Sequence, residues 1–289
     1  MHGKVSYGAN ASPGKEARPG DILGSVPSDP ILRRCQEVLT RVPAGVTIVA
    51  AAKGRTPSEI RAAIRAGIGH IGENYVQEAN RNKEAVPEPA TWHMIGRLQS
   101  NKVRKALQIF DWLQTVDALP LAQRMNAGLA LQREVRPVLI QVNIGREPQK
   151  GGVLPEDLFP LAQAIRGLPH LRFRGLMAIP PPGETPEDSR PYFRALRRLL
   201  ERLRGEGFAV DTLSMGMSAD WEVAVEEGAT MIRLGTLLFG PPRRRQARRT
   251  ARARRARTSP SPVVPSTTRP VRRQPNSRPS APTVATHGT

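Results

Sequence analysis

Residues 46–53 read VTIVAAAK, an apolar and β-branched run that is typical of a buried strand and ends in a lysine. Residues 54–60 read GRTPSEI, in which a glycine and a Thr-Pro pair indicate a turn and the start of a helix. Together they predict one βα unit. Lys53 would then stand where the strand ends and the chain turns toward the helix.

The same alternation of strand and helix continues along the chain. Strand candidates cover residues 46–53, 68–74, 91–96, 110–116, 136–143, 172–179, 212–218 and 230–235, with helical stretches between them. Strands that are buried on both faces read as continuous apolar runs, as parallel sheets require. The pattern predicts an α/β protein with a (β/α)8 TIM barrel. Strand counting alone leaves an open, doubly wound sheet as the alternative, although no G-x-G-x-x-G follows the first strand.

The two ends of the chain differ in composition from the alternating segment. Residues 1–28 are rich in Gly, Pro, Ser and charge, without periodicity. The segment 241–289 holds 13 Arg, 9 Pro and no acidic residue, so it carries most of the net charge of +19. Such segments bury too little apolar surface to offset the entropy of ordering. We expect disordered extensions at 1–28 and 243–289 around a barrel of residues 29–242.

Composition also disfavours several classes of protein. The one cysteine, Cys35, allows no intramolecular disulfide, which fits a reducing compartment. No apolar run approaches the ~18 residues of a bilayer span, and the first 21 residues lack the apolar segment of a secretory signal. We therefore expect a cytoplasmic protein without a membrane partner. The five histidines show no metal-ligand spacing, and few aromatic residues are present to stack on nucleic-acid bases.

The carboxyl ends of parallel barrel strands form the active face, so polar residues there are candidates for a site. The sequence places Lys53, Asn74 and His93 at these ends, with the segments 214–218 and 233–236. Backbone N–H groups in the last two segments are suited to hold a phosphate near strands seven and eight. Each feature alone is better explained by helix capping or a tight turn. Together with Lys53 they describe a pocket for a phosphorylated aldehyde.

Two interpretations of Lys53 follow from its position. A lysine at a strand end usually extends its ammonium group to water or pairs with a nearby carboxylate. A lysine desolvated by apolar neighbours instead has a lowered pKa and becomes a nucleophile for a carbonyl group. The local run alone favours the first interpretation, and the phosphate-binding features favour the second.

Several motifs, in this order, resemble those of the pyridoxal phosphate (PLP) homeostasis proteins, the YggS/PROSC family. They are AAAKGRTPSEI, GENYVQEA, WHMIGRLQSNK, QKGG, RGLMAIPP and LSMGMSADWEVAVEEGATMIRLGTLLFG, within about residues 46–240. The resemblance implies a barrel like that of the alanine racemase N-terminal domain, found in the fold type III PLP enzymes. It also implies a PLP Schiff base on Lys53, a phosphate held by the segments of Ser214, Gly216, Met217, Gly235 and Thr236, Arg233 facing the pyridine nitrogen, and Asn74 and His93 lining the pocket.

The function that the resemblance implies is intracellular PLP homeostasis, with PLP-dependent apoenzymes as recipients. The racemases carry a further C-terminal β domain that we do not find after Gly240, which favours a non-catalytic carrier. A PLP enzyme with weak amino-acid racemase activity is the alternative. Ala51, Ala52 and Gly54 replace residues that are usually larger or hydroxylated in the family, which predicts weaker PLP binding.

The remaining expectations concern assembly and the arginine-rich tail. We expect a monomer, with no metal and no specific nucleic acid. The tail could bind polyanions non-specifically through its arginines. We favour an inert extension or a frame-shifted reading of GC-rich DNA over this binding role.

Overall fold

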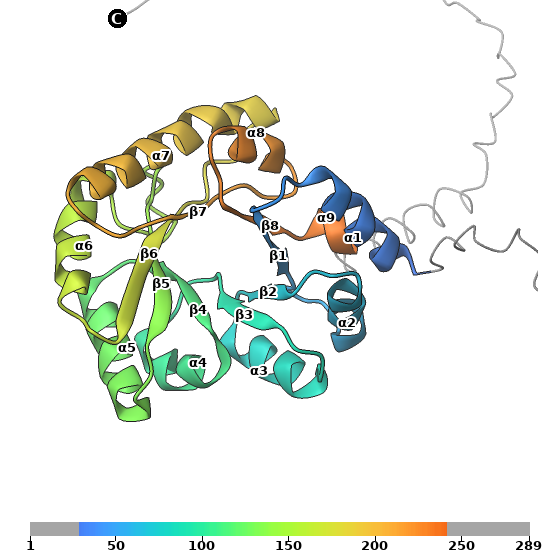
Figure 1. Cartoon of the computed structure of the whole chain (residues 1–289), viewed down its shortest axis with the longest axis horizontal. Coiled ribbons are helices and arrows are strands. Elements are labelled where there is room, and N and C mark those ends of the chain that lie inside the picture. The colour runs from blue at the N-terminus through green and yellow to red at the C-terminus, as the bar shows by residue number, and fades with distance from the viewer. Residues whose placement is uncertain (1–28, 242–289) are drawn as a thin grey trace, which may run out of the picture. The chain divides into compact units, whose positions relative to one another are not determined.

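Eight parallel strands pair in chain order and close into a barrel, with β8 beside β1 (Figure 1). The computed structural model describes residues 29–241, and the expectations for residues 1–28 and 243–289 lie outside them. The strands are β1 Thr47–Ala51, β2 His70–Glu73, β3 Thr91–Met94, β4 Trp112–Val116, β5 Arg136–Gln141, β6 Leu171–Met177, β7 Thr212–Ser214 and β8 Met231–Leu234. The closure confirms the predicted TIM barrel and rules out the open, doubly wound sheet.

Helices surround the barrel, each following a strand except the first, which precedes β1 (Figure 1). They are α1 Pro30–Arg41, α2 Pro57–Arg65, α3 Val76–Ala85, α4 Val103–Ile109, α5 Leu119–Gln132, α6 Leu158–Arg166, α7 Arg190–Gly205, α8 Trp221–Glu226 and α9 Thr236–Phe239. Short 3-10 turns η1 Ser100–Lys102, η2 Pro155–Asp157 and η3 Pro186–Ser189 precede α4, α6 and α7. The alternation of strand and helix read from the sequence is therefore correct.

The start of α2 is set by its own sequence and fixes the turn that carries Lys53. Thr56 is the N-cap, and its side chain and that of Glu59 form a reciprocal capping box, with Pro57 as the first helical residue. Gly54 adopts a left-handed φ of +69° in the turn before it. β1 ends at Ala51, so Lys53 lies in this turn and not on the strand.

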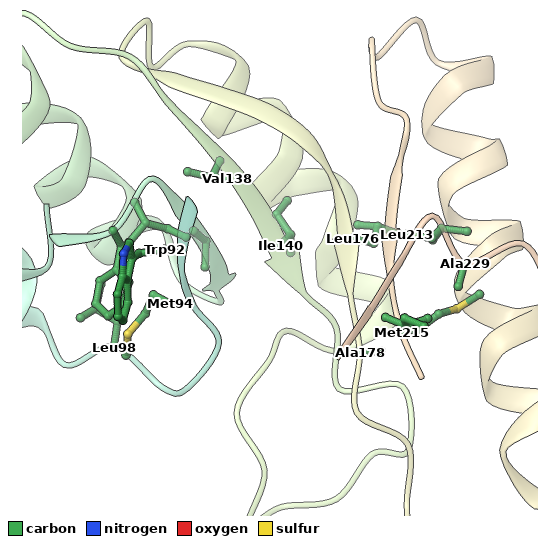
Figure 2. Close-up of a cluster of buried hydrophobic side chains, with 14 of the residues drawn as sticks. Trp92, Met94, Leu98, Val138, Ile140, Leu176, Ala178, Leu213, Met215 and Ala229 are labelled. Carbon is green, nitrogen blue, oxygen red and sulfur yellow. The ribbon is translucent and has the colours of Figure 1, made fainter. Parts of the chain in front are cut away.

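The main hydrophobic core lies between the barrel and the helices. Trp92, Met94, Val138, Ile140 and Leu213 belong to this buried cluster, and Figure 2 shows them among its members. Side chains alternate between the two faces of a strand. The residues that alternate with such apolar ones therefore point into the barrel, and several of them are polar, among them His93, Gln114, Ser214 and Arg233.

Two further features of residues 29–241 bear on the expected class of protein. No helix within this range is long and apolar enough to cross a membrane. The range also brings together no three His, Cys, Asp or Glu side chains that could hold a metal ion. Cys35 is buried on α1, and burial raises the pKa of its thiol to about 11, so the thiol is uncharged at neutral pH.

Candidate functional site

Lys53 stands exposed at the mouth formed by the carboxyl ends of the strands. Its Nζ lies 5.4 Å from the centre of the Tyr75 ring, a residue that follows β2 and is half exposed. Of the two interpretations of Lys53, the exposed side chain agrees with the one in which the ammonium group extends to water. The amine is open to a molecule that enters the mouth.

Asn74 lies beside Tyr75, and its position depends on a close approach of the loop after β3. A Cβ added to Gly96 in that loop would overlap the carbonyl oxygen of Asn74 and lie 2.7 Å from its Cα. A cavity of about 690 Å³ opens at this side of the mouth, with Asn74, Tyr75, Arg97, Lys102 and Asp117 among its lining residues. The cavity adjoins Lys53 through Tyr75, whose ring faces the Lys53 amine.

The contact between Gly96 and Asn74 gives a first prediction. Gly96→Ala should displace Asn74 and lower the free energy of unfolding by about 1–3 kcal/mol, the usual cost of overpacking. Urea denaturation measures this change. Gly69→Ala is the control, because an added Cβ at Gly69 meets no atom within 4 Å. Equal stability of the two variants would contradict the prediction.

The two loops that were predicted to hold a phosphate are joined to each other. The Ser218 hydroxyl accepts hydrogen bonds from the N–H groups of Gly235, at 3.1 Å, and Leu237, at 3.2 Å. Ser218 thus caps the first turn of α9 from the loop after β7, which agrees with the capping interpretation of the serines. Thr236 is exposed at the start of α9, and an added Cβ at Gly235 would lie 3.5 Å from the Ala51 carbonyl oxygen at the end of β1. The phosphate candidates therefore lie on the Lys53 side of the barrel.

The loop after β7 is held in shape by a glycine and an aspartate. Gly216 has a left-handed φ of +91°, and a Cβ there would lie 2.6 Å from the Cβ of Ala224. Asp220 occupies the N-cap position of α8, but its side chain makes no capping bond to that helix. Its carboxylate accepts the N–H of Met217 at 2.7 Å and the hydroxyl of Ser189 at 2.8 Å. Asp220 therefore orders the loop that carries Gly216 and Met217.

Arg233 is buried inside the barrel just below the mouth. It donates hydrogen bonds to the Ser214 hydroxyl at 2.7 Å and to the Ala178 carbonyl oxygen at 2.8 Å. Burial lowers the pKa of Arg233 to about 10, while Asp220 acts in the opposite direction. The guanidinium therefore stays protonated at neutral pH. Ser214 is fully buried and bonded to Arg233, so its hydroxyl faces the barrel interior and not an exposed phosphate cup.

The structure places His93 deeper than the sequence suggested. It is fully buried on β3, where Nε2 contacts His70 Nδ1 and Nδ1 contacts Gln114 Nε2, both at 2.9 Å. Its ring also stacks on Trp112 at 5.6 Å between ring centres. These contacts lie inside the barrel, so His93 is not brought together with Lys53 and Asn74 at the mouth.

Gln114 is an interior residue that the sequence reasoning missed. It is fully buried on β4 and joins His93 to Ser214. A signal for it was present, because an isolated polar residue at an inward-facing position of an otherwise apolar strand needs a buried partner. Ser218 was recognised as a candidate next to Gly216, but its link to the loop after β8 was not foreseen.

Comparisons with known proteins agree with this fold and show the family. Residues 28–242 match the family described as alanine racemase, N-terminal domain. The pyridoxal phosphate homeostasis protein of Pseudomonas aeruginosa is 43% identical over 210 residues, which cover 72% of this chain and 90% of that protein. The structure of PipY from Synechococcus elongatus with PLP bound is 36% identical, with a TM-score of 0.69, and covers 73% of this chain and 100% of PipY.

A more distant structure shares the fold alone. Alanine racemase of Clostridium difficile in complex with cycloserine is 15% identical, with a TM-score of 0.62, and the match covers 73% of this chain and 59% of that enzyme. The relatives at about 40% identity carry the name of a homeostasis protein. The chain belongs to the family of pyridoxal phosphate homeostasis proteins, built on the alanine racemase N-terminal domain.

Proposed function

We propose that this protein binds pyridoxal 5′-phosphate and serves PLP homeostasis as a carrier and not as an enzyme. The observation that carries the proposal is the convergence of the exposed Lys53 amine and the buried Arg233 guanidinium on one barrel mouth. The names of the relatives and the PLP-bound structure of PipY support it.

The residues at the mouth fit each polar part of the cofactor. Bound PLP would supply an aldehyde carbon that is reactive toward an amine. Lys53 would offer that amine on the mouth side of β1. In the loops of Gly216–Met217 and Gly235–Thr236, the N–H groups of Met217 and Gly235 already donate to Asp220 and Ser218. The N–H groups of Gly216 and Thr236 are left as candidates to bind a phosphate dianion. Arg233 lies under the mouth, where it would face the ring nitrogen.

The charge of Arg233 favours holding over turnover. A guanidinium has only donors, so it leaves a ring nitrogen opposite to it without a proton. An unprotonated pyridine is a poorer electron sink than one paired with a carboxylate. The site therefore suits a protein that keeps PLP more than one that stabilises a carbanion.

The finer parts of the proposal concern the recipients of PLP, the cellular compartment and the oligomeric state. We propose that PLP-dependent apoenzymes receive the cofactor, because Lys53 is exposed and the neighbouring Tyr75 lines a cavity of about 690 Å³. We also propose that the protein works in the cytoplasm as a monomer. No specific binding of nucleic acid forms part of this proposal.

A weak amino-acid racemase remains the second candidate. It is favoured by the phenol of Tyr75, which stands next to Lys53 as a possible acid or base. Turnover of several amino acids at saturating PLP separates the two functions. A carrier shows none, and racemisation that is lost in Tyr75→Phe would favour the enzyme.

The direct test of PLP binding is borohydride trapping followed by peptide mass mapping. The native protein should give a visible absorption band with PLP and, after reduction, one PLP adduct on Lys53. Lys53→Ala should lose the band and the adduct, and its Kd for PLP should rise at least about ten-fold, because a covalent bond is lost. Lys105→Ala, an exposed lysine on α4, is the control and should behave as the native protein. An unchanged adduct in Lys53→Ala would overturn the proposal.

A further inference from the structure

Five polar side chains form one continuous chain of hydrogen bonds through the inside of the barrel. Nη1 of Arg233 contacts Ser214 Oγ at 2.7 Å, and Ser214 Oγ contacts Gln114 Oε1 at 2.7 Å. Gln114 Nε2 contacts His93 Nδ1, and His93 Nε2 contacts His70 Nδ1, each at 2.9 Å. All of these residues are buried except His70, which is half-buried.

This chain of hydrogen bonds crosses the barrel from one end to the other. At the mouth, Arg233 is also bonded to the carbonyl oxygen of Ala178, which follows β6. At the other end, His70 is the first residue of β2 and lines a cavity of about 310 Å³ together with Thr47 and Arg174. No motif of the sequence singled out Gln114, the residue in the middle of this path.

The donors in this chain all point in the same direction. Arg233 can only donate, so Ser214 accepts from it and must give its own proton to Gln114 Oε1. The amide nitrogen of Gln114 then faces His93 Nδ1, with the Met231 sulfur also 3.1 Å from that nitrogen. In the reverse amide orientation the Ser214 oxygen would accept from both Arg233 and Gln114, and the Ser214 proton would lose its acceptor on Gln114. His93 is therefore a neutral ring that carries its proton on Nε2 and donates it to His70.

The environment of His93 maintains this state. Burial lowers the pKa of His93 to about 3, with the neighbouring His70 acting in the same direction. A neutral imidazole has one donor and one acceptor, and both are used here. Aligned hydrogen bonds in a low-dielectric interior polarise one another, so each link strengthens the next.

We propose that Gln114 and His93 are positioning residues that fix Arg233 and Ser214 for the cofactor. Gln114 holds the Ser214 hydroxyl so that its lone pair faces Arg233 and its proton does not. The guanidinium then has one fixed acceptor below the mouth and loses less side-chain freedom when a ligand binds. The role of Arg233 toward the cofactor rests on the proposed function. The direction of the hydrogen bonds from Arg233 to His70 does not.

Substitutions in the middle of the chain test the positioning role. Gln114→Leu should raise the Kd for PLP about ten-fold, which is about 1.4 kcal/mol, and shift the visible band of the loaded protein, because Ser214 loses the acceptor that orients its hydroxyl toward Arg233. His93→Leu should have a smaller effect in the same direction. His93→Gln keeps an acceptor and a donor, so it should recover most of the affinity. Thr212→Val is the control: it removes a buried hydroxyl outside the chain, on the same strand as Ser214, and should leave the Kd within about two-fold.

The tautomer of His93 tests the inference in the native protein, where no variant has to fold. Long-range ¹H–¹⁵N NMR of the free protein should show a bare Nδ1 and a protonated Nε2. A protonated Nδ1 would overturn the direction of the chain. Native PLP affinity and an unchanged band in Gln114→Leu would overturn the positioning role. If the native protein itself fails to bind PLP, the proposed function fails. The tautomer of His93 then still tests the direction of the hydrogen bonds.

Discussion

Arg233→Met is expected to weaken PLP binding by about ten- to hundred-fold while leaving the free protein close to native stability. The loss of affinity follows from a charge-assisted hydrogen bond, which is worth about 1.5–3 kcal/mol. Stability should change little because two effects oppose each other. Met removes the donors to Ser214 and Ala178, but it also removes a buried cation whose pKa falls to about 10 on burial, a cost of about 3 kcal/mol.

This separation of affinity from stability is measured by PLP titration and by urea denaturation of the same sample. Arg174→Met is the matched control, because Arg174 lies on β6 and pairs with Asp211 at the opposite end of the barrel. It should leave the Kd for PLP unchanged. An Arg233→Met protein that binds PLP as tightly as the native protein would remove Arg233 from the cofactor site. A variant that unfolds would show that Arg233 is needed for the fold.

The barrel was predictable because its signal is local. Each buried parallel strand is an apolar run, and each helix start carries its own cap, as Thr56 and Glu59 show for α2. The ends of strands were less well predicted. β7 stops at Ser214 because Gly216 turns the chain in a left-handed conformation, whereas the apolar pattern runs on to residue 218. The exposure of Lys53 follows from a similar turn at Gly54.

The interior of the barrel was harder to predict. It depends on which face of its strand a residue occupies and on which side chains reach it from strands on the opposite side of the barrel. His93 lies between Trp92 and Met94, which both face the helices, so alternation alone directs it inward. Its partners on β2 and β4 are fixed by the register of the sheet. No short-range pattern encodes that Gln114 reaches Ser214, 100 positions further along the chain.

Glu73 is expected to make the free energy of unfolding depend on pH. It is fully buried at the end of β2, where Asn82 of α3 donates to Oε1 at 2.6 Å and Oε2 has no hydrogen-bond partner. Burial raises the pKa of Glu73 from 4.5 to about 7, against the opposing effect of Asn82. Below pH 4.5 the carboxyl is protonated in both the folded and the unfolded chain, so no penalty exists. As pH rises toward 7, the Glu73 carboxyl ionises in the unfolded chain before it ionises in the folded one. The free energy of unfolding therefore falls over this range.

The folded protein should therefore lose about 3 kcal/mol of unfolding free energy between pH 4.5 and 7 through Glu73 alone. Glu73→Gln cannot ionise, so its free energy of unfolding relative to the native protein should increase by about that amount over the same range. Urea denaturation at pH 4.5 and pH 8 measures this change, and any constant cost of the buried amide cancels between the two values. Glu84→Gln, an exposed position on α3, controls for the change in net charge. Parallel pH profiles for Glu73→Gln and the native protein would show that Glu73 ionises as readily in the folded chain as in the unfolded one.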